Sequence, residues 1–318
     1  MTVDYNWLVA QCHVPVFFET WYLNAVCGAN GFDSAISYID PQIWGILPYF
    51  TANYQSYTVA IAPPLTQYMG PFLHIDSSIS RGKQISLEEK LIFNLLDQLS
   101  QRCDYYAQKW GPWQQNWLGA YYNHCKEASR ITYIIDGQSS YETVKNGYST
   151  QVRNKTKNKD NITVVTYNDV ELLYSMVLES LDRVGKKPKF AIEELHRLTS
   201  AAIANHAGEI LVAFLPTGVP IASAFIIEDS KTLYYYIAGE YAAYRGANGP
   251  TLIIDKCIQK ACAQRKRLDF TGSMLPGVGR FYQSFGPTLI NYHMISKDNR
   301  SSNHLANDSL DRVLFFRF

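Results

Sequence analysis

The segment that most limits what this chain can fold into is residues 267–286. Leu268–Phe270 forms a short strand-like run, and the small residues 271–273 that follow are typical of a turn. Pro276–Gly277 then introduces a short helix, which Gly286 ends. A strand that enters a helix through small residues lets a ligand come close to backbone N–H groups. We therefore expect a ligand to approach the backbone here.

Four side chains of this segment offer a base, two hydroxyls and a cation. They are Asp269, Ser273, Tyr282 and Arg280. Asp269 could accept a proton, or it could cap the turn that follows it, which is the commoner role of such an aspartate. Arg280 could bind a phosphate or carboxylate, or it could lie on the surface.

The same residues resemble the last part of a GNAT-type acyltransferase domain, and most closely that of the FemABX-like group, which carries two such domains in one chain. That group has a strand ending Asp-Phe-x-Gly-Ser, a Pro-Gly turn, and a helix that contains Arg/Lys-Phe-Tyr and closes on Ser-Phe-Gly. This chain reads Asp269–Ser273, Pro276–Gly277 and Arg280–Gly286 in the same order. The resemblance implies that Tyr282 is the acid of the reaction. Packing in the core beside Phe281 is the alternative.

Length and composition fit a soluble protein of two domains. The chain has 318 residues, of which 47% are hydrophobic and 18% charged. Its 29 basic and 28 acidic residues give no drive towards DNA or a membrane. No signal peptide or membrane span is evident, so we expect a cytoplasmic protein. The six cysteines form no C-x-x-C pair and no histidine joins them at zinc spacing, which favours reduced thiols and no metal.

The first half reads as a helix followed by short strands. A helix with apolar residues at helical spacing ends at Gly28, and strands are expected at 33–39, 43–49 and 57–61. FemABX-like relatives have a Pro-Pro-Leu-Thr-Gln run that resembles residues 63–67 here. Thr66 and Gln67 could therefore bind the acceptor, or could simply close the Pro-Pro turn.

A helix and a strand complete this half. Residues 86–101 predict an amphipathic helix, whose start is marked by Ser86 and Glu89 as a capping box. The aromatic region 104–124 gives no clear pattern, and 131–136 predicts a strand.

A basic stretch, residues 139–161, links the halves and is expected to be helical. In relatives it reads Tyr-Ser-x-x-x-Arg-x-x-x-Lys, and Arg153 and Lys157 match that pattern. These two residues could clamp a phosphate of the acceptor, for which the guanidinium fork is well suited. The alternative is a solvated helix face.

The second half has the element order of a GNAT domain. A strand at 162–167 precedes two helices, and a meander of three strands follows at 209–215, 221–228 and 232–238. A loop then leads into a helix over residues 251–264.

That loop is the candidate donor site. GNAT domains hold the pyrophosphate of coenzyme A with Arg/Gln-x-x-Gly-x-Gly/Ala, and this loop resembles the pattern without matching it. The candidate donor-binding residues are Arg245, Gly246, Ala247, Asn248 and Gly249. Asn248 replaces a glycine of the pattern, and Pro250 removes one N–H from the start of the helix. An ordinary glycine-rich loop is the alternative.

The expected fold is α/β with mixed sheets, made of two tandem GNAT-like domains and a substrate cleft between them. We place the N-terminal domain at residues 1–138 and the C-terminal domain at 139–318. Tyr282, Asp269 and Ser273 are the candidate catalytic residues. Thr66, Gln67, Arg153, Lys157 and Arg280 are the candidate acceptor-binding residues.

The resemblance implies an N-acyltransferase that acts on a small amine acceptor, such as an amino sugar, a sugar nucleotide or a cell-envelope precursor. The donor is acetyl-CoA or another acyl-CoA, or aminoacyl-tRNA. Fem-type enzymes that use aminoacyl-tRNA often carry a long helical arm, and no heptad run supplies one here, which disfavours that donor. A module that binds a glycan, peptide or partner protein without catalysis is the alternative function.

Overall fold

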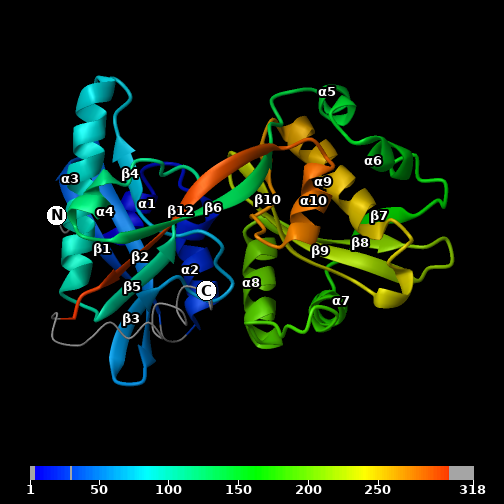
Figure 1. The fold of residues 1–318 in the computed structure, drawn as a ribbon, viewed down its shortest axis with the longest axis horizontal. Helices are drawn as coiled ribbons and strands as arrows, with labels where there is room; N and C mark the ends of the chain where they lie inside the picture. Colours follow the sequence, from blue (N-terminus) through cyan, green and yellow to red (C-terminus); the bar gives the residue numbers. More distant parts are fainter. Residues whose placement is uncertain (1–3, 29–30, 301–318) are drawn as a thin grey trace. The chain divides into compact units, whose positions relative to one another are not determined.

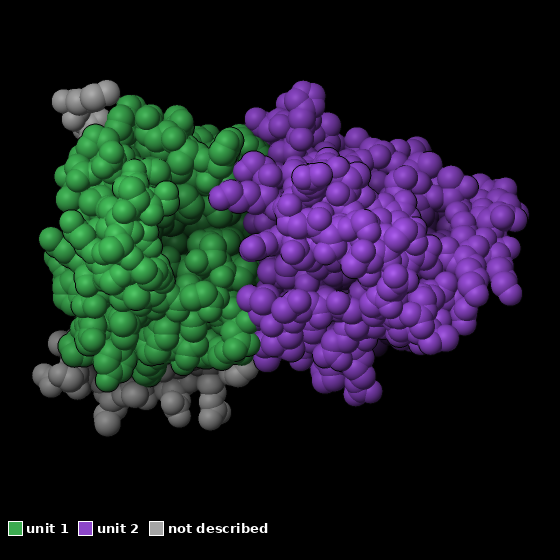
Figure 2. Space-filling view, turned by 90° about the horizontal axis from the view of Figure 1, so that it is seen from above, with its two compact units in different colours: residues 1–130, 291–318 green, residues 131–290 purple. Residues whose placement is uncertain are grey.

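The computed structural model describes residues 4–28 and 31–300. The chain forms two compact units, coloured separately in Figure 2: unit 1 is residues 1–130 with 291–318, and unit 2 is residues 131–290. Strand β12 (Thr288–Asp298) therefore begins in unit 2 and ends in unit 1. The assignment of GNAT-like domains to residues 1–138 and 139–318 stays a prediction.

Unit 1 contains a mixed sheet in the order β1-β2-β3-β5-β12 (Figure 1). Its other strands are β1 (Asp33–Asp40), β2 (Ile43–Tyr54), β3 (Tyr57–Ile61), β4 (Phe72–Ile75), which pairs with β2, and β5 (Tyr105–Lys109). Only the β3–β5 pairing among the neighbouring strands of this order is parallel. The helices are α1 (Tyr5–Val9), α2 (Thr20–Cys27), α3 (Arg81–Ser100) and α4 (Leu118–Tyr122).

Helix α3 shows why this unit folds. Leu91, Leu95 and Leu99 recur at a spacing of four residues and are buried, and Leu95 and Leu99 pack in one cluster with residues of β1 and β2. The predicted start of this helix is wrong. The helix begins at Arg81, and Ser86 lies inside it with its hydroxyl donating to the carbonyl oxygen of Gly82 at 3.3 Å. Residues 81–85 contain no proline, and Gly82 costs only about 1 kcal/mol, so the helical turns continue towards the N-terminus past the expected cap.

In unit 2 the strand order is β6-β11-β10-β9-β8-β7. The strands are β6 (Lys126–Ile135), whose first five residues belong to unit 1, β7 (Thr163–Thr166), β8 (Gly208–Phe214), β9 (Pro220–Glu228), β10 (Thr232–Glu240) and β11 (Arg267–Asp269). The predicted meander is confirmed, since β8, β9 and β10 pair antiparallel. Strand β11 pairs parallel with β10.

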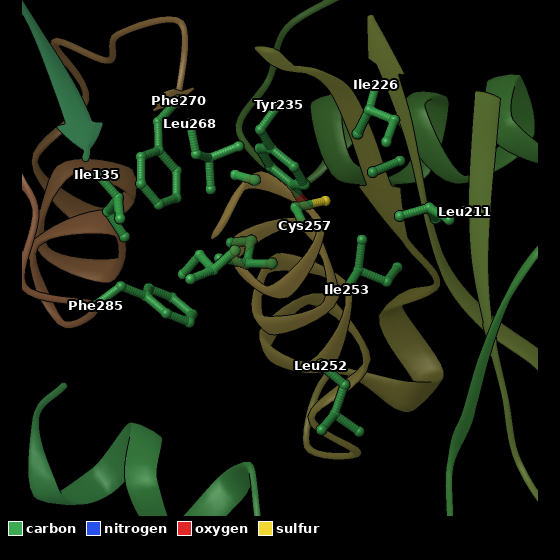
Figure 3. Packing of buried hydrophobic residues seen from close by; sticks show 14 of the residues in the cluster. Ile135, Leu211, Ile226, Tyr235, Leu252, Ile253, Cys257, Leu268, Phe270 and Phe285 are labelled. Atoms are coloured by element: carbon green, nitrogen blue, oxygen red, sulfur yellow. The ribbon is translucent and has the colours of Figure 1, made fainter. Parts of the chain in front are cut away.

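Helices cover both faces of the unit 2 sheet. Helices α7 (Val170–Asp182) and α8 (Ile192–Ala204) lie on one face, and α9 (Gly249–Gln264) and α10 (Pro276–Gln283) on the other. Figure 3 shows the core under α9, where Ile253 and Cys257 face Leu211 and Ile226 of the strands. Burying each of these aliphatic side chains contributes about 1.5–3 kcal/mol.

The link over residues 139–161 differs from expectation. It forms two short helices, α5 (Tyr141–Asn146) and α6 (Thr150–Lys155), instead of one. Ser140 and Ser149 each accept a hydrogen bond from a backbone N–H two or three residues into the helix that follows. Serine favours such caps over helix interiors, so Ser149 starts a new helix and breaks the continuous one.

Two further observations concern composition. All six cysteines lie within the described residues, and none is joined to another in a disulfide. Among the described helices, none has the length and apolar character needed to cross a membrane.

Candidate functional site

The turn after β11 is organised by Asp269. This residue is 1% exposed, and its Oδ1 atom accepts hydrogen bonds from Thr132 Oγ1 at 2.5 Å and from the backbone N–H of Thr271 at 2.7 Å. Thr271 and Gly272 both have positive φ values, 57° and 74°. A threonine in this conformation is strained, so the hydrogen bonds of Asp269 help to hold the turn. The geometry favours the capping role among the two roles expected for Asp269.

Tyr282 lies on α10 among other aromatic rings. Its ring centroid lies 4.6 Å from that of Phe270, and Tyr133 and Tyr235 contact it at 6.1 and 6.2 Å. The ring packs against the core while the residue keeps some exposure, and the role of Tyr282 as the acid stays a prediction. The Tyr282 hydroxyl makes no hydrogen bond with any described residue.

Burial raises the pKa of Tyr282 well above its usual range. The hydroxyl therefore keeps its proton at neutral pH, and a phenol that is protonated and unpaired can donate to a ligand. It suits the role of a hydrogen-bond donor or acid better than that of a base.

The packing contact between α10 and strand β6 was not expected from the sequence. Tyr133 of β6 is 3% exposed, and its hydroxyl accepts a hydrogen bond from Gln283 Nε2 at 3.2 Å. That hydroxyl also lies 2.9 Å from the position a Cβ atom would take on Gly279. A glycine three residues before Tyr282 was the only sequence signal of this close approach.

The other two residues of the segment lie near the start and on the outside of α10. The Oγ of Ser273 accepts a hydrogen bond from the N–H of Leu275 at 3.2 Å, which shapes the entry to the helix. Arg280 is exposed and pairs with no acid in the described part of the chain.

The candidate donor loop lies between the short 3₁₀ helix η3 (Ala242–Tyr244), which follows β10, and helix α9. Asn248 has a φ of 65° and caps α9 by position, although its side chain makes no capping hydrogen bond. Gly249 is buried, and a Cβ atom there would lie 2.8 Å from the Cβ of Ala222. Packing of the helix on β9 therefore requires Gly249, whether or not a ligand binds.

Two arginines share one carboxylate beside this loop. Arg245 Nε lies 3.9 Å from Glu240 Oε1, and Arg183 Nη1 lies 3.1 Å from the same oxygen. Arg245 is 66% exposed in its side chain, whereas Glu240 is 16% exposed. Glu179 Oε2 also accepts a hydrogen bond from the N–H of Ala242 at 2.9 Å, so two cations and two carboxylates lie near this loop. Arg183 was not among the expected site residues because it lies on a different helix.

The distance from this loop to Tyr282 follows from β10. Tyr235 of β10 contacts Tyr282, and Glu240 lies five residues further along the strand. Five residues of strand span about 17 Å. A ligand held at the loop would therefore have to extend along β10 to reach the hydroxyl of Tyr282.

The expected acceptor residues are placed in both units. In unit 2, Arg153 and Lys157 are exposed at α6 and after it, and Lys157 Nζ donates to Asn154 Oδ1 at 3.0 Å. In unit 1, Thr66 Oγ1 donates to the carbonyl oxygen of Pro64 at 3.2 Å, and Gln67 Nε2 donates to the Tyr292 hydroxyl at 3.4 Å. Thr66 therefore does close the Pro-Pro turn, as the alternative reading had it.

Unit 2 contains most of the candidates. It holds the Asp269 turn, Tyr282 and Arg280 on α10, the donor loop, and the basic residues of α6. Helix α6 is tied to α10 by a 2.8 Å hydrogen bond from Ser149 N to Ser284 O. No group of histidine, cysteine and acidic side chains in the described ranges could hold a metal ion.

Comparison with known proteins defines the class of fold first. No family model matches the chain, and no curated protein matches it by sequence. Solved structures do match, and they place the chain among mixed α/β proteins made of two GNAT-like domains. The predicted fold class is confirmed.

Three solved structures illustrate the similarity to this chain. FemX has a TM-score of 0.65 at 12% identity, with 100% of this chain and 99% of FemX covered. L-PGS from Bacillus licheniformis has a TM-score of 0.61 at 12% identity, over 98% of this chain and 95% of the other. The C-terminal DUF2156 domain of a candidate lysylphosphatidylglycerol synthetase from Agrobacterium fabrum has a TM-score of 0.56 at 10% identity, over 93% and 90%. The predicted resemblance to FemABX-like acyltransferases is confirmed at the level of the fold.

Proposed function

We propose that this chain is an acyltransferase of the FemABX-like kind, which moves an aminoacyl or other acyl group onto an amine of a cell-envelope precursor or lipid. The observation that carries the proposal is the hydroxyl of Tyr282, which is protonated, unpaired among the described residues, and held on α10 by packed rings. The names of the structural neighbours support the choice of reaction class.

The reaction needs few groups from the protein. The acceptor amine, which has lost a proton to solvent, attacks the carbonyl carbon of the donor and forms a C–N bond. The bond from that carbon to the ester oxygen or thioester sulfur breaks, and the leaving atom takes a proton from Tyr282. The new amide nitrogen loses its extra proton to solvent, and Tyr282 regains a proton from solvent, so the protons balance. We propose that Asp269 acts through the turn and not as the base, because Thr132 and the N–H of Thr271, which donate to it, belong to the fold itself.

Aminoacyl-tRNA is the donor we favour. The absence of a helical arm spoke against it, but the chain matches FemX over 99% of the length of FemX, so no large insertion separates the two. The donor loop departs from the coenzyme A pattern, since Pro250 supplies no N–H and Asn248 caps α9 without a side-chain hydrogen bond. Acyl-CoA stays the alternative donor.

For the acceptor, we propose a phosphorylated cell-envelope precursor held by Arg153, Lys157 and Arg280. All three are exposed cations in unit 2, and none pairs with an acid in the described ranges. A phosphatidylglycerol headgroup is a second phosphate-bearing acceptor, which the names of two neighbours suggest.

Transfer of a labelled acyl group tests the proposal. A mixture of tRNAs charged with radiolabelled amino acids and, separately, labelled acetyl-CoA are offered with nucleotide-linked amino-sugar precursors or with phosphatidylglycerol vesicles. We expect transfer from the tRNA mixture. The Tyr282→Phe variant should lose about 10²–10⁴-fold in kcat with unchanged affinity for the donor.

The control is Tyr235→Phe, which removes a hydroxyl from a neighbouring ring and should leave kcat within about twofold of wild type. Equal turnover by the Tyr282→Phe variant would remove Tyr282 from the mechanism. Absence of transfer from both donors to every acceptor would refute the proposed acyltransferase activity.

A binding module without catalysis is the second candidate, and the departures in the donor loop favour it. Thermal unfolding separates the two. A ligand at about 100 times its Kd stabilises the folded state by about 2.7 kcal/mol. Stabilisation by a nucleotide sugar with none by either donor would support the module.

A further inference from the structure

A buried carboxylate in α9 is not explained by the proposed reaction. Asp255 is 6% exposed, and no cation pairs with it within the described ranges. It accepts hydrogen bonds from three neutral donors: the hydroxyls of Tyr148 and Tyr141, each at 2.9 Å, and Gln259 Nε2 at 2.9 Å. A buried carboxylate without a cation is tolerated only when it is well hydrogen-bonded. Asp255 is therefore an anchor point for the segments that supply these donors.

The two tyrosines come from the link that holds α5 and α6. Tyr141 is the first residue of α5, whereas Tyr148 lies between the two helices. Tyr148 also reaches the end of α10, because its ring packs edge-on, at 5.4 Å, against Phe285, which lies two residues after that helix. Tyr148 is 2% exposed and so joins α9 and α10 through one side chain. Burial and the nearby Asp255 raise the pKa of Tyr148, so its hydroxyl remains a donor.

The residues on either side of Tyr148 hold Arg153. Its Nη1 donates to the carbonyl oxygen of Asn146 at 3.2 Å, and its Nη2 donates to Thr150 Oγ1 at 3.3 Å. A guanidinium carries five N–H donors, so these two contacts fix its orientation and leave others for a ligand. Arg153 is exposed and pairs with no carboxylate in the described part of the chain.

We propose that Tyr148 is a positioning residue for Arg153. By tying the backbone between Asn146 and Thr150 to α9 and α10, it holds the guanidinium in the orientation that receives a phosphate of the acceptor. The inference rests on the proposed phosphate-binding role of Arg153. Preorganisation of this kind improves affinity because the orientation is already fixed before the ligand binds.

Tyr141 provides a matched control. Tyr141→Phe removes a hydrogen bond to the same carboxylate as Tyr148→Phe, so the two variants should lose similar stability. The Tyr141 hydroxyl, however, is bonded to α9 residues at the far end of α5, seven residues before Tyr148. If the Asp255 anchor were purely structural, both variants would weaken phosphate binding alike. If Tyr148 positions Arg153, only Tyr148→Phe would weaken phosphate binding.

The experiment measures binding of inorganic pyrophosphate to the whole chain by titration calorimetry at low ionic strength. We expect Arg153→Ala to weaken binding about tenfold, as expected for loss of a charge-assisted contact. Tyr148→Phe should weaken it about fivefold, and Tyr141→Phe should change it less than twofold. The double variant Tyr148→Phe/Arg153→Ala should bind no more weakly than Arg153→Ala, because both changes act through one guanidinium.

Each other result counts against the inference. Wild-type binding by Tyr148→Phe, with weak binding by Arg153→Ala, would overturn the positioning role and leave the role of Arg153 intact. Equal weakening by the two tyrosine variants would show a structural anchor only. Wild-type binding by Arg153→Ala, or no binding by the wild type, would overturn both the phosphate-binding role of Arg153 and the positioning role of Tyr148. The labelled-transfer assay tests the proposed enzyme activity separately.

A second variant covers the case in which Tyr148→Phe does not fold. Ser149→Ala removes the hydroxyl that caps α6 at the N–H of Val152, a 3.3 Å contact, and leaves the Asp255 anchor in place. It should also weaken pyrophosphate binding, and its effect should likewise disappear when Arg153→Ala is already present. An effect that persists in the Arg153→Ala background would refute the inference.

Discussion

The hydroxyl of Tyr133 lies 2.9 Å from the position that a Cβ atom would take on Gly279. Strand β6 and helix α10 therefore touch at a point where only glycine fits. Tyr282 is the third residue after this contact, so the contact fixes the height of Tyr282 above the sheet.

Replacing Gly279 with alanine should destabilise the protein, although alanine is normally better in a helix by about 1 kcal/mol. The added methyl group would push on the buried ring of Tyr133 and disturb its hydrogen bond with Gln283. We expect a net loss of about 1–3 kcal/mol in the free energy of unfolding, measured by urea titration.

Gly277→Ala is the matched control, since a Cβ atom at Gly277 meets nothing within 4 Å. This variant should be as stable as wild type or more so. Gly279→Ala that proved as stable as Gly277→Ala would contradict the close approach.

Asp269→Asn separates the two readings of Asp269. An organiser of the turn should lose stability, by about 1–3 kcal/mol, because an amide accepts the bonds from Thr132 and Thr271 less well than a carboxylate. Transfer activity of the folded variant should fall by less than about tenfold. A loss of about 10³-fold in kcat with unchanged stability would instead identify Asp269 as the base.

The ion pairs of Lys260 should make the stability of the protein depend on pH in the acid range. Lys260 Nζ lies 2.6 Å from Glu209 and 2.9 Å from Glu228. Burial alone would raise the pKa of Glu209, but the hydrogen bonds from Lys260 and Thr166 lower it overall. A lowered carboxyl pKa stabilises the fold above the ordinary value of about 4.3, and this stability is lost as the pH falls through the lowered pKa.

Lys260→Met should therefore lower the free energy of unfolding by about 2 kcal/mol at pH 7. This loss lies between those expected for breaking an exposed and a buried salt bridge. The variant should also lose less stability between pH 5 and pH 3 than the wild type, a range of about two units around the ordinary pKa. Lys256→Met on the same helix removes an exposed lysine that forms no salt bridge among the described residues and acts on Glu209 only through its charge. It should change stability by less than about 0.5 kcal/mol. Equal pH profiles for Lys260→Met and wild type would refute the assignment.

The cysteines should label in two classes. Burial raises the pKa of Cys103 to about 11 and those of Cys27 and Cys125 to about 12. Because the thiolate is the reactive form, these thiols should resist Ellman's reagent at pH 8 until the protein unfolds. The half-buried Cys12 and Cys262 should react first. Rapid labelling in a Cys12→Ser/Cys262→Ser variant would contradict the described core.

The sequence predicted elements well where local signals were strong. Helix α2 ends at Gly28, which has the expected left-handed φ of 59°, and the strands of the unit 2 meander lie within two residues of their predicted bounds. Local signals failed at the start of α3 and in the link, where Ser86 and Ser149 had opposite outcomes. A serine can cap a helix or lie within one, and its neighbours in space decide which.

For the candidate site, too, the sequence predicted some features and not others. The turn at 267–286, the residues Asp269 and Tyr282, and the loop at 245–249 could all be named from the order of residues. Their roles could not, because the sequence does not show that Asp269 is buried against Thr132 or that Tyr282 lies among three rings. Tyr133, Arg183 and Asp255 were missed, since each lies far along the chain from the residues it contacts.

By itself, the sequence determined the order of helices and strands and the residues that carry chemistry, because periodicity, turn residues and caps act within a few positions of one another. Only the tertiary structure decided which of those residues are buried, which are paired, and which reach the same place. The contact between Tyr148 and Asp255 joins positions 107 residues apart. Such a contact depends on how the sheet and helices pack, and packing is a property of the whole core and not of any one segment.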